Sequence, residues 1–384
     1  MQRFAIVVLI AGCYRPSEVC TQEATCLPSD SMPPDMLTLG DAPAGAPCAG
    51  ETGLLGEICR QPASTLSITG AETLDTSDDP RCDPTASMIC LVAATSINIS
   101  ANLNVIGSRP LVLWSATTIE VTGVIDAASR RSAPAKLGPG ANFVGCEEVR
   151  GEQIGVGPSF GAGGGGGGFG TAGGRGGDGA GETEVVLNEQ ISMSKTLALH
   201  GGCPGGTGGA TPSASVGNGG GAVYLMARTL IRITGSITAS GAAGGGGTGG
   251  SSFAGGGGGG GSGGLIGLEA PMIELDGASL STLGGGGGSG GKSLSGSGTL
   301  GNIGADPGID PPALAIGGSE TAVQNGGGDG SSLDGLGVGP GGNATTTAQN
   351  AGTGGGGGGG GGGYIKLYGN LTDLNQSRVS PPAI

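Results

Sequence analysis

Glycine content constrains the fold of this chain more than any other feature of its sequence. Of the 384 residues 93 are glycine, and 81 of these follow residue 150. Glycine loses more backbone entropy on ordering than other residues and adds no side chain to a core. The tracts must therefore be mobile loops or pack backbone against backbone, which polyglycine can do as an extended threefold helix related to polyproline II. The longest tracts are 161–181, 241–264, 284–301 and 352–363.

A short strand motif recurs before and between these tracts: an aliphatic residue, any residue, a second aliphatic residue, a polar residue and glycine. Strict alternation of apolar and polar residues predicts a half-buried β-strand. Apolar segments before the later copies predict a strand, a corner and a second strand in each unit. The copies lie at 66–70, 119–123, 231–235 and 273–277, with a variant at 97–105, weaker copies at 191–199 and 364–374, and preceding strands at 111–114, 223–226 and 265–268.

The motif is constant while its spacing is irregular, which indicates stacked coils with insertions of variable length. We therefore predict an all-β fold, a right-handed parallel β-helix-like solenoid with polyglycine corner insertions. The alternative is a β-sandwich with disordered glycine-rich loops. It is less favoured because antiparallel hairpins usually have Asn-Gly or Asp-Gly turns between adjacent strands.

The N-terminus has the layout of an export signal. One basic residue precedes an apolar run over 4–11, which is too short to cross a bilayer. The run Leu9-Ile10-Ala11-Gly12-Cys13 then resembles the lipobox of bacterial lipoproteins. This resemblance implies a lipid on Cys13 and, because Tyr14 is not aspartate, sorting to the outer membrane or cell surface. The alternative is an ordinary secretion signal in which Cys13 is simply another thiol.

These features divide the chain into four expected parts. They are a signal peptide at 1–12, a Cys/Pro-rich lipidated tether at 13–50, the first solenoid coils at 51–150 and the glycine-rich solenoid at 151–384.

The cysteine count agrees with lipidation. Nine cysteines are present, and assigning Cys13 to a lipid leaves eight, which can pair completely in an exported chain. A metal or cofactor is not expected, because no Cys-x-x-Cys pair occurs and His200 is the single histidine. The spacing suggests three short loops and one long bridge, namely Cys20 with Cys26, Cys48 with Cys59, Cys82 with Cys90, and Cys146 with Cys203.

Several motifs associated with catalysis or binding occur by chance in glycine-rich sequence. A phosphate-loop pattern ends at Lys292 and Ser293 without a helix-forming segment after it, and nucleophile-elbow patterns surround Ser262 and Ser289. A single calcium nonapeptide lies at 173–178, whereas such sites need tandem copies. We expect His200 to be an exposed polar side chain.

Carboxylates on the polar positions of the strands would be the catalytic groups of a polysaccharide-cleaving enzyme. The candidates are Glu120, Asp126, Glu274 and Asp276, which recur in only two coils. We interpret them as a solvated polar face and assign no catalytic residue.

Composition narrows the function. A net charge of −14 and a pI near 4.4 disfavour nucleic acid as a partner. The glycine tracts resemble those of mycobacterial-type PGRS surface proteins, and their expected packing resembles that of phage tail-tip adhesins and small glycine-rich antifreeze proteins. We expect a non-catalytic, structural or adhesive surface lipoprotein. Its partners would be the membrane, through the lipid, and extracellular matrix, polysaccharide or other surface components. The alternatives are a secreted polysaccharide-cleaving β-helix enzyme and a mostly disordered glycine-rich display linker.

Overall fold

The structure is a computed structural model, and its chain forms two compact units, Met1–Thr38 and Leu39–Ile384. In the first unit, β1 (Glu18–Cys20) pairs with β2 (Cys26–Pro28) in an antiparallel hairpin that sets Cys20 opposite Cys26. No described residue belongs to a helix, so none of them contributes a helix long and apolar enough to span a membrane. The described residues are 18–20, 26–28, 45–50, 53–62, 64–146, 160–179, 199–209, 213–293, 298–309, 312–319, 326–331, 352–372 and 377–381.

The second unit contains two large parallel sheets and one small hairpin, β3 (Cys48–Ala49) with β4 (Ile58–Cys59). The nine-stranded sheet consists of β5 (Leu66–Ile68), β7 (Cys90–Ala94), β8 (Ile97–Ile99), β10 (Leu111–Ser115), β11 (Thr118–Val121), β13 (Ala222–Ala227), β14 (Leu230–Ile233), β16 (Leu265–Leu275) and β18 (Tyr364–Thr372). The six-stranded sheet consists of β6 (Glu72–Asp75), β9 (Asn102–Ile106), β12 (Val124–Asp126), β15 (Ser236–Thr238), β17 (Ser279–Ser281) and β19 (Arg378–Ser380).

Equivalent residues of the strand motif stack on one another, and we call the two sheets together the strand stack. In β11, β14 and β16 the residues Ile119, Ile231 and Ile273 lie in register, and all three are fully buried. Their polar neighbours face outward, as the alternation predicts. The inward residues of both sheets form one aliphatic core. The strands expected before and within each described motif copy are therefore present, whereas most of the degraded copy at 191–199 lies outside the described residues.

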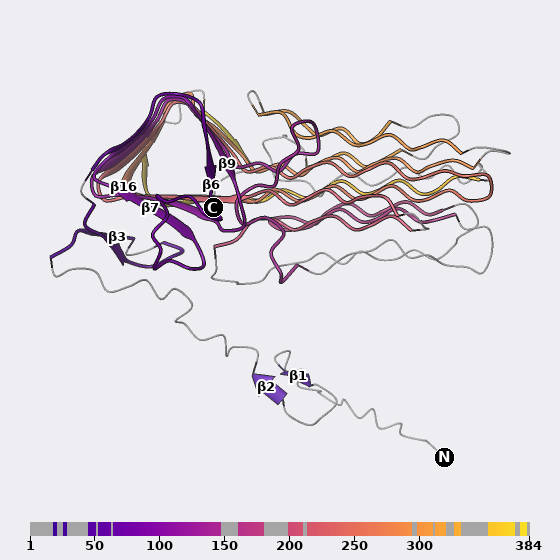
Figure 1. The fold of residues 1–384 in the computed structure, drawn as a ribbon, viewed down its shortest axis with the longest axis horizontal. Coiled ribbons are helices and arrows are strands. Elements are labelled where there is room, and N and C mark those ends of the chain that lie inside the picture. The colour runs from indigo at the N-terminus through magenta and orange to yellow at the C-terminus, as the bar shows by residue number, and fades with distance from the viewer. Residues whose placement is uncertain are drawn as a thin grey trace, which may run out of the picture. The chain divides into compact units, whose positions relative to one another are not determined.

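The fold predicted from the sequence, a right-handed parallel β-helix-like solenoid with polyglycine corner insertions, is wrong. β16 is one continuous strand whose first half pairs with β13 and whose second half pairs with β14, so two rows of strands merge into a single nine-stranded sheet around the core. The glycine tracts that connect the two sheets pair with one another in a body of their own and do not form separate corner loops (Figure 1). The β-sandwich alternative is also wrong, because every pairing within these two sheets is parallel.

The glycine tracts lie side by side in an ordered bundle, which we call the polyglycine array. Its central tract is 255–264. The eight successive amides from Gly257 to Gly264 donate hydrogen bonds to three neighbouring tracts in turn, so that every third amide donates to the same tract. Carbonyls of the same segment accept hydrogen bonds from three other tracts. This rotation has the three-residue period of the extended polyglycine helix. The acceptor tracts are 203–209, 239–247 and 352–363, and the donor tracts are 160–170, 213–221 and 284–292.

The array connects the two sheets. The chain leaves the six-stranded sheet after β15 and β17 through glycine tracts, and other tracts lead it directly into β13, β16 and β18 of the nine-stranded sheet. Figure 1 shows these tracts extending together from one side of the strand stack. Because the array and the strand stack share chain at these later crossings, each positions the other.

Candidate functional site

The polyglycine array has no room for a side chain at most of its interior glycines, and at 259–261 each added Cβ would meet a different neighbouring tract. A Cβ added to Gly259, Gly260 or Gly261 would lie 1.9, 2.0 or 2.0 Å from a carbonyl oxygen of a different neighbouring tract. Real Cβ atoms do not approach backbone oxygens so closely, so glycine is required at these positions by sterics. The array is thus a body built from paired backbone.

The two nucleophile-elbow serines lie inside this array and act as bridges. Ser262 and Ser289 are fully buried. The Ser262 hydroxyl accepts a hydrogen bond from the Cys203 amide at 2.8 Å, and the Ser289 hydroxyl accepts one from the Asn302 amide at 2.6 Å. Each hydroxyl therefore satisfies a backbone group between tracts.

The other chance motifs also belong to the array or its rim. Lys292 pairs in an antiparallel bridge with Thr299, which differs from the strand-to-helix turn of a phosphate loop. In the calcium-like segment 173–178 the amides of Gly174 and Gly177 donate to Gly359 and Gly356. These segments serve backbone pairing between tracts.

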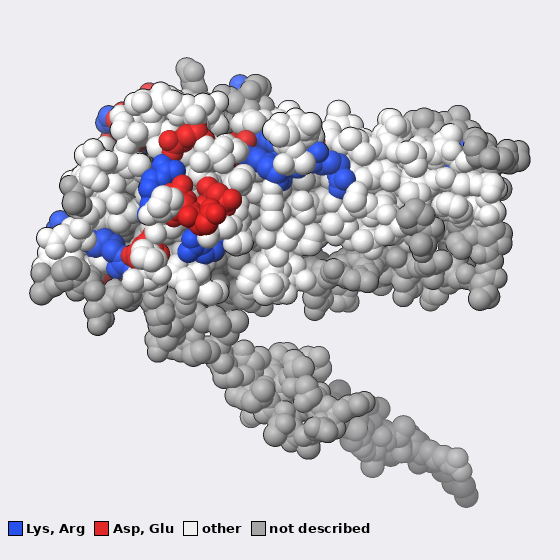
Figure 2. Space-filling view, in the orientation of Figure 1, with Lys and Arg blue, Asp and Glu red and all other residues white. Residues whose placement is uncertain are grey.

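Charged side chains gather elsewhere. Figure 2 shows Asp, Glu, Lys and Arg over the strand stack and the adjoining start of the array, while the described remainder of the array on this face carries almost none. The described part of the array therefore presents a nearly uncharged surface on this side.

The four candidate carboxylates do not form one site. Glu120 and Glu274 lie on either side of Arg232 along the row formed by β11, β14 and β16, and Arg232 Nε donates to Glu274 Oε2 at 2.7 Å. Asp126 belongs to the other sheet, where it pairs with Lys136, and Asp276 follows the end of β16. The described geometry brings no two of these carboxylates together as an acid and base pair.

His200 is buried, so the expectation of an exposed side chain is wrong. The residue is 4% exposed, and its ring stacks on Phe143 at a centroid distance of 4.3 Å and packs against Phe169 at 5.0 Å. Burial lowers the pKa of His200 and outweighs the opposing effect of its contact with the Gly201 carbonyl. Sequence reasoning missed this because Phe143 and Phe169 are distant in sequence.

Three disulfides are present among the described residues, and each joins two cysteines that the spacing suggested. Cys48 is bonded to Cys59 across the β3–β4 hairpin, Cys82 to Cys90, and Cys146 to Cys203. The last one ties a tract of the array to the segment that follows β12. The side chains of Cys20 and Cys26, and all of Cys13, lie outside the described part of the structure, so their roles stay predictions.

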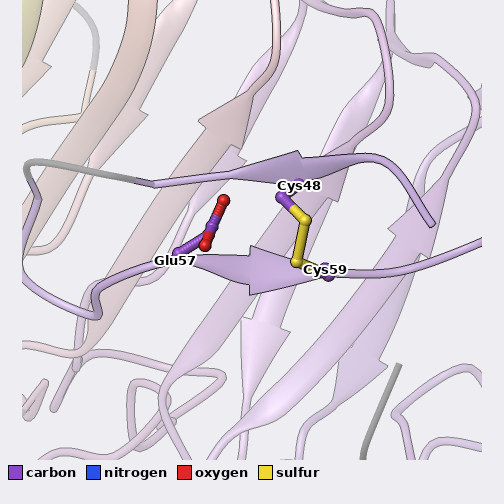
Figure 3. A group of neighbouring side chains, drawn as sticks. All are labelled: Cys48, Glu57 and Cys59. Carbon is purple, nitrogen blue, oxygen red and sulfur yellow. A yellow bond between two sulfur atoms is a disulfide. The ribbon is translucent and has the colours of Figure 1, made fainter. Parts of the chain in front are cut away.

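One disulfide lies beside a carboxylate in an arrangement that superficially resembles a metal site. Ligand atoms of Cys48, Glu57 and Cys59 all lie within 4.8 Å of one another. Figure 3 shows that both sulfur atoms belong to the disulfide, which leaves no thiolate to bind a metal. With the disulfide intact, Glu57 would be the single ligand of this group.

A buried tyrosine and carboxylate pair lies under the same hairpin. Tyr224 donates a hydrogen bond to Glu269 Oε2 at 2.7 Å and accepts one from the Leu54 amide at 3.0 Å. Burial, followed by the contact with Glu269, raises the pKa of Tyr224. Gly267 leaves the room in which the Tyr224 ring packs, since a Cβ there would lie 2.1 Å from that ring. The pair therefore helps to seat the hairpin on the sheet.

Comparisons with known proteins add no family to these observations. No family model matches the chain, and neither the curated proteins nor the solved structures contain a significant match to it.

Proposed function

We propose that this protein is a non-catalytic structural or adhesive component of the cell surface, exported and anchored through a lipid on Cys13. The polyglycine array is the observation that carries this proposal. A chain whose backbone is paired with six neighbouring tracts is stiff, and its interior glycines leave no room for larger side chains or a ligand. The strand stack gives this array a folded base.

The exposed face of the array suits contact with an extended partner. Its described surface is nearly free of charged side chains on the face that Figure 2 displays. The array surface as a whole offers backbone groups, serine and threonine hydroxyls, and the exposed apolar side chains of Leu300, Ile303 and Ile316. A polysaccharide, a matrix protein or another extended surface component would match it better than a compact small molecule, which needs a pocket.

Two further observations support a surface protein without catalysis. Disulfides persist in oxidising compartments, and three are formed among the described residues. The carboxylates that an enzyme would need are divided between two sheets or paired with cations. We assign no cofactor, and the expected partners exclude nucleic acid because the chain carries a net charge of −14.

A single methyl group tests the adhesive role of the array. Gly261→Ala places a Cβ 2.0 Å from the Asn218 carbonyl, whereas Gly70→Ala adds one at an open position with nothing within 4 Å. We expect Gly261→Ala to reduce retention on polysaccharide-coated or matrix-coated surfaces at least about tenfold, which corresponds to roughly 1.4 kcal/mol. Gly70→Ala should be retained like the wild type.

Circular dichroism and amide hydrogen exchange show whether the array alone is disturbed. Unchanged retention of a Gly261→Ala variant whose array amides have lost protection would reject the adhesive role. Cleavage of any offered polysaccharide by the wild-type protein would reject the non-catalytic assignment.

A further inference from the structure

A hairpin on the outer face of the six-stranded sheet places a lysine over two neighbouring strands. After β12 the chain turns back, and Arg130 and Lys136 exchange backbone hydrogen bonds of 2.9 and 3.0 Å. This return lays the Lys136 side chain against Asp126 of β12 and Asn104 of β9. The Lys136 side chain is 10% exposed, so the ammonium group is withdrawn from most of the solvent.

The contacts of Lys136 are short and specific. Its Nζ donates to Asn104 Oδ1 at 2.6 Å and lies 2.8 Å from Asp126 Oδ2. Asn104 and Asp126 are register partners on adjacent parallel strands, and Thr73 is the register partner of Asn104 on its other side. Asn104 Nδ2 donates to Thr73 Oγ1 at 3.3 Å. An amine, a carboxamide and a carboxylate are thus held in one row.

We propose that Lys136 and Asn104 join in an isopeptide bond between Lys136 Nζ and Asn104 Cγ, with Asp126 as the group that transfers protons. Asn104 Cγ is bonded to Oδ1, the oxygen that Nζ already contacts at 2.6 Å. Nζ and Cγ are therefore close to the separation of about 3 to 3.5 Å at which reacting atoms are poised to form a bond. This inference does not depend on the proposed function.

The reaction balances without an oxidant or co-reactant. One proton first passes from Nζ to Asp126, which leaves a neutral amine. Nζ then attacks Asn104 Cγ, and the Nζ–Cγ bond forms as Nζ loses a second proton. Both protons end on Nδ2, the Cγ–Nδ2 bond breaks and the nitrogen leaves as ammonium. Asp126 returns to its carboxylate form, and nothing is oxidised or reduced.

The surroundings favour the neutral amine and hold both reactants in place, whereas Arg130 Nη2, 3.5 Å from Asp126 Oδ1, stabilises the ionised form of Asp126. Burial lowers the pKa of Lys136, although the negative charge of Asp126 opposes this effect. The lowered pKa helps to produce the neutral amine that attacks. The Ala128 amide donates to Asp126 Oδ1 at 3.2 Å and so directs the other carboxylate oxygen toward Lys136. Thr73 holds the departing nitrogen. Asp126 is assigned as the proton carrier because its Oδ2 lies 2.8 Å from Nζ and can accept and return the proton while Asn104 supplies the carbonyl carbon.

The bond would be a covalent tie that reduction cannot open. It would close a loop of the chain between residues 32 apart, from β9 to the end of the hairpin, in addition to the disulfides. Asn104→Ala and Lys136→Arg should therefore lower the thermal unfolding midpoint by similar amounts, and the double variant should be no less stable than either single variant.

Mass spectrometry of the reduced and digested full-length protein tests the proposal. We expect a cross-linked peptide containing Asn104 and Lys136 whose mass is lower than the sum of its parts by one ammonia molecule. Lys136→Arg, processed identically, should yield the two separate peptides. Asp126→Asn keeps both reactants and should also leave them separate, while Asp126→Glu should restore part of the cross-link.

Circular dichroism confirms that each variant is folded before it is compared. A folded wild-type protein whose Lys136 amine is acetylated by an amine-reactive reagent and whose peptides are separate would overturn the proposal. A cross-link that loses water and joins Lys136 to Asp126 would overturn it equally.

Discussion

At the scale of single residues, Asp306 shows how one carboxylate joins the hairpin that follows β12 to the polyglycine array. Its oxygens accept hydrogen bonds from the amides of Arg131 and Ser132 in the hairpin after β12 and from the amide of Ala243 in the array. The Ser132 hydroxyl donates to it as well, at 2.6 Å. Asp306 therefore satisfies backbone groups that the array and the hairpin leave open.

The pH dependence of stability should reveal this role. Burial by itself would raise the pKa of Asp306, but the hydrogen bonds from Ser132, Ala243 and Arg131 together lower it below the ordinary value. A lowered folded pKa means that the stabilisation is complete above the ordinary value, about 3.9, and is lost as the pH falls through the folded value. We expect Asp306→Asn to cost about 1 to 2 kcal/mol at pH 7.

Denaturant unfolding of both proteins between pH 7 and pH 2.5 measures this effect. The difference between wild type and Asp306→Asn should shrink as the solution becomes more acidic. A difference that is independent of pH would show that the charge of Asp306 does not contribute.

At the scale of secondary-structure elements, the parallel register makes neighbouring strands depend on one another. Ile233 of β14 is fully buried and lies in register between Val121 of β11 and Leu275 of β16. Arg232, one residue earlier, points outward and pairs with Glu274. Of these two adjacent positions in one strand, one packs in the core and the other forms an ion pair on the outer face.

Substitutions at these two positions should separate the roles. Ile233→Asp places an unpaired charge in the core and should destabilise the protein by more than about 3 kcal/mol, with loss of several neighbouring strands together. Arg232→Ala should leave the unfolding midpoint almost unchanged, because exposed ion pairs contribute little. Hydrogen exchange resolves the strands that open. Exchange confined to β14 in the Ile233→Asp protein would contradict the cooperative stack.

At the scale of the whole molecule, the predicted anchor precedes the two large sheets and the array in the sequence. The two large sheets and the array are built from residues after Cys59, while the lipobox-like run ends at Cys13. Removal of the lipid acceptor should therefore change location without changing the fold.

The variant Cys13→Ser tests this separation in cells. Metabolic fatty-acid labelling should mark the wild-type protein and not the variant, and the variant should move from the membrane fraction to the soluble fraction. Its circular dichroism spectrum should match that of the wild-type protein. An unlabelled wild-type protein would refute the lipid anchor.

The sequence by itself determined the strands of the described motif copies and two of the short disulfide loops, Cys48 with Cys59 and Cys82 with Cys90. Alternation in segments such as 231–233 follows from the two-residue period of a strand, and Cys82 and Cys90 are close enough along the chain to meet without knowledge of the fold. The same alternation marked Asp126 as an outward residue. These features depend on local chemistry, which a single sequence contains.

Only the tertiary structure decided how the glycine tracts pack, how β16 joins two rows of strands, and which groups meet Asp126. Glycine has no side chain whose size or polarity could indicate its packing partners. The sequence of 255–264 therefore could not predict the six tracts that surround it. Lys136 reaches Asn104 because a hairpin folds back over two strands whose register is set by the stack. The physical reason is common to all three: each depends on contacts between segments distant in the chain, whose geometry exists only after the backbones have paired.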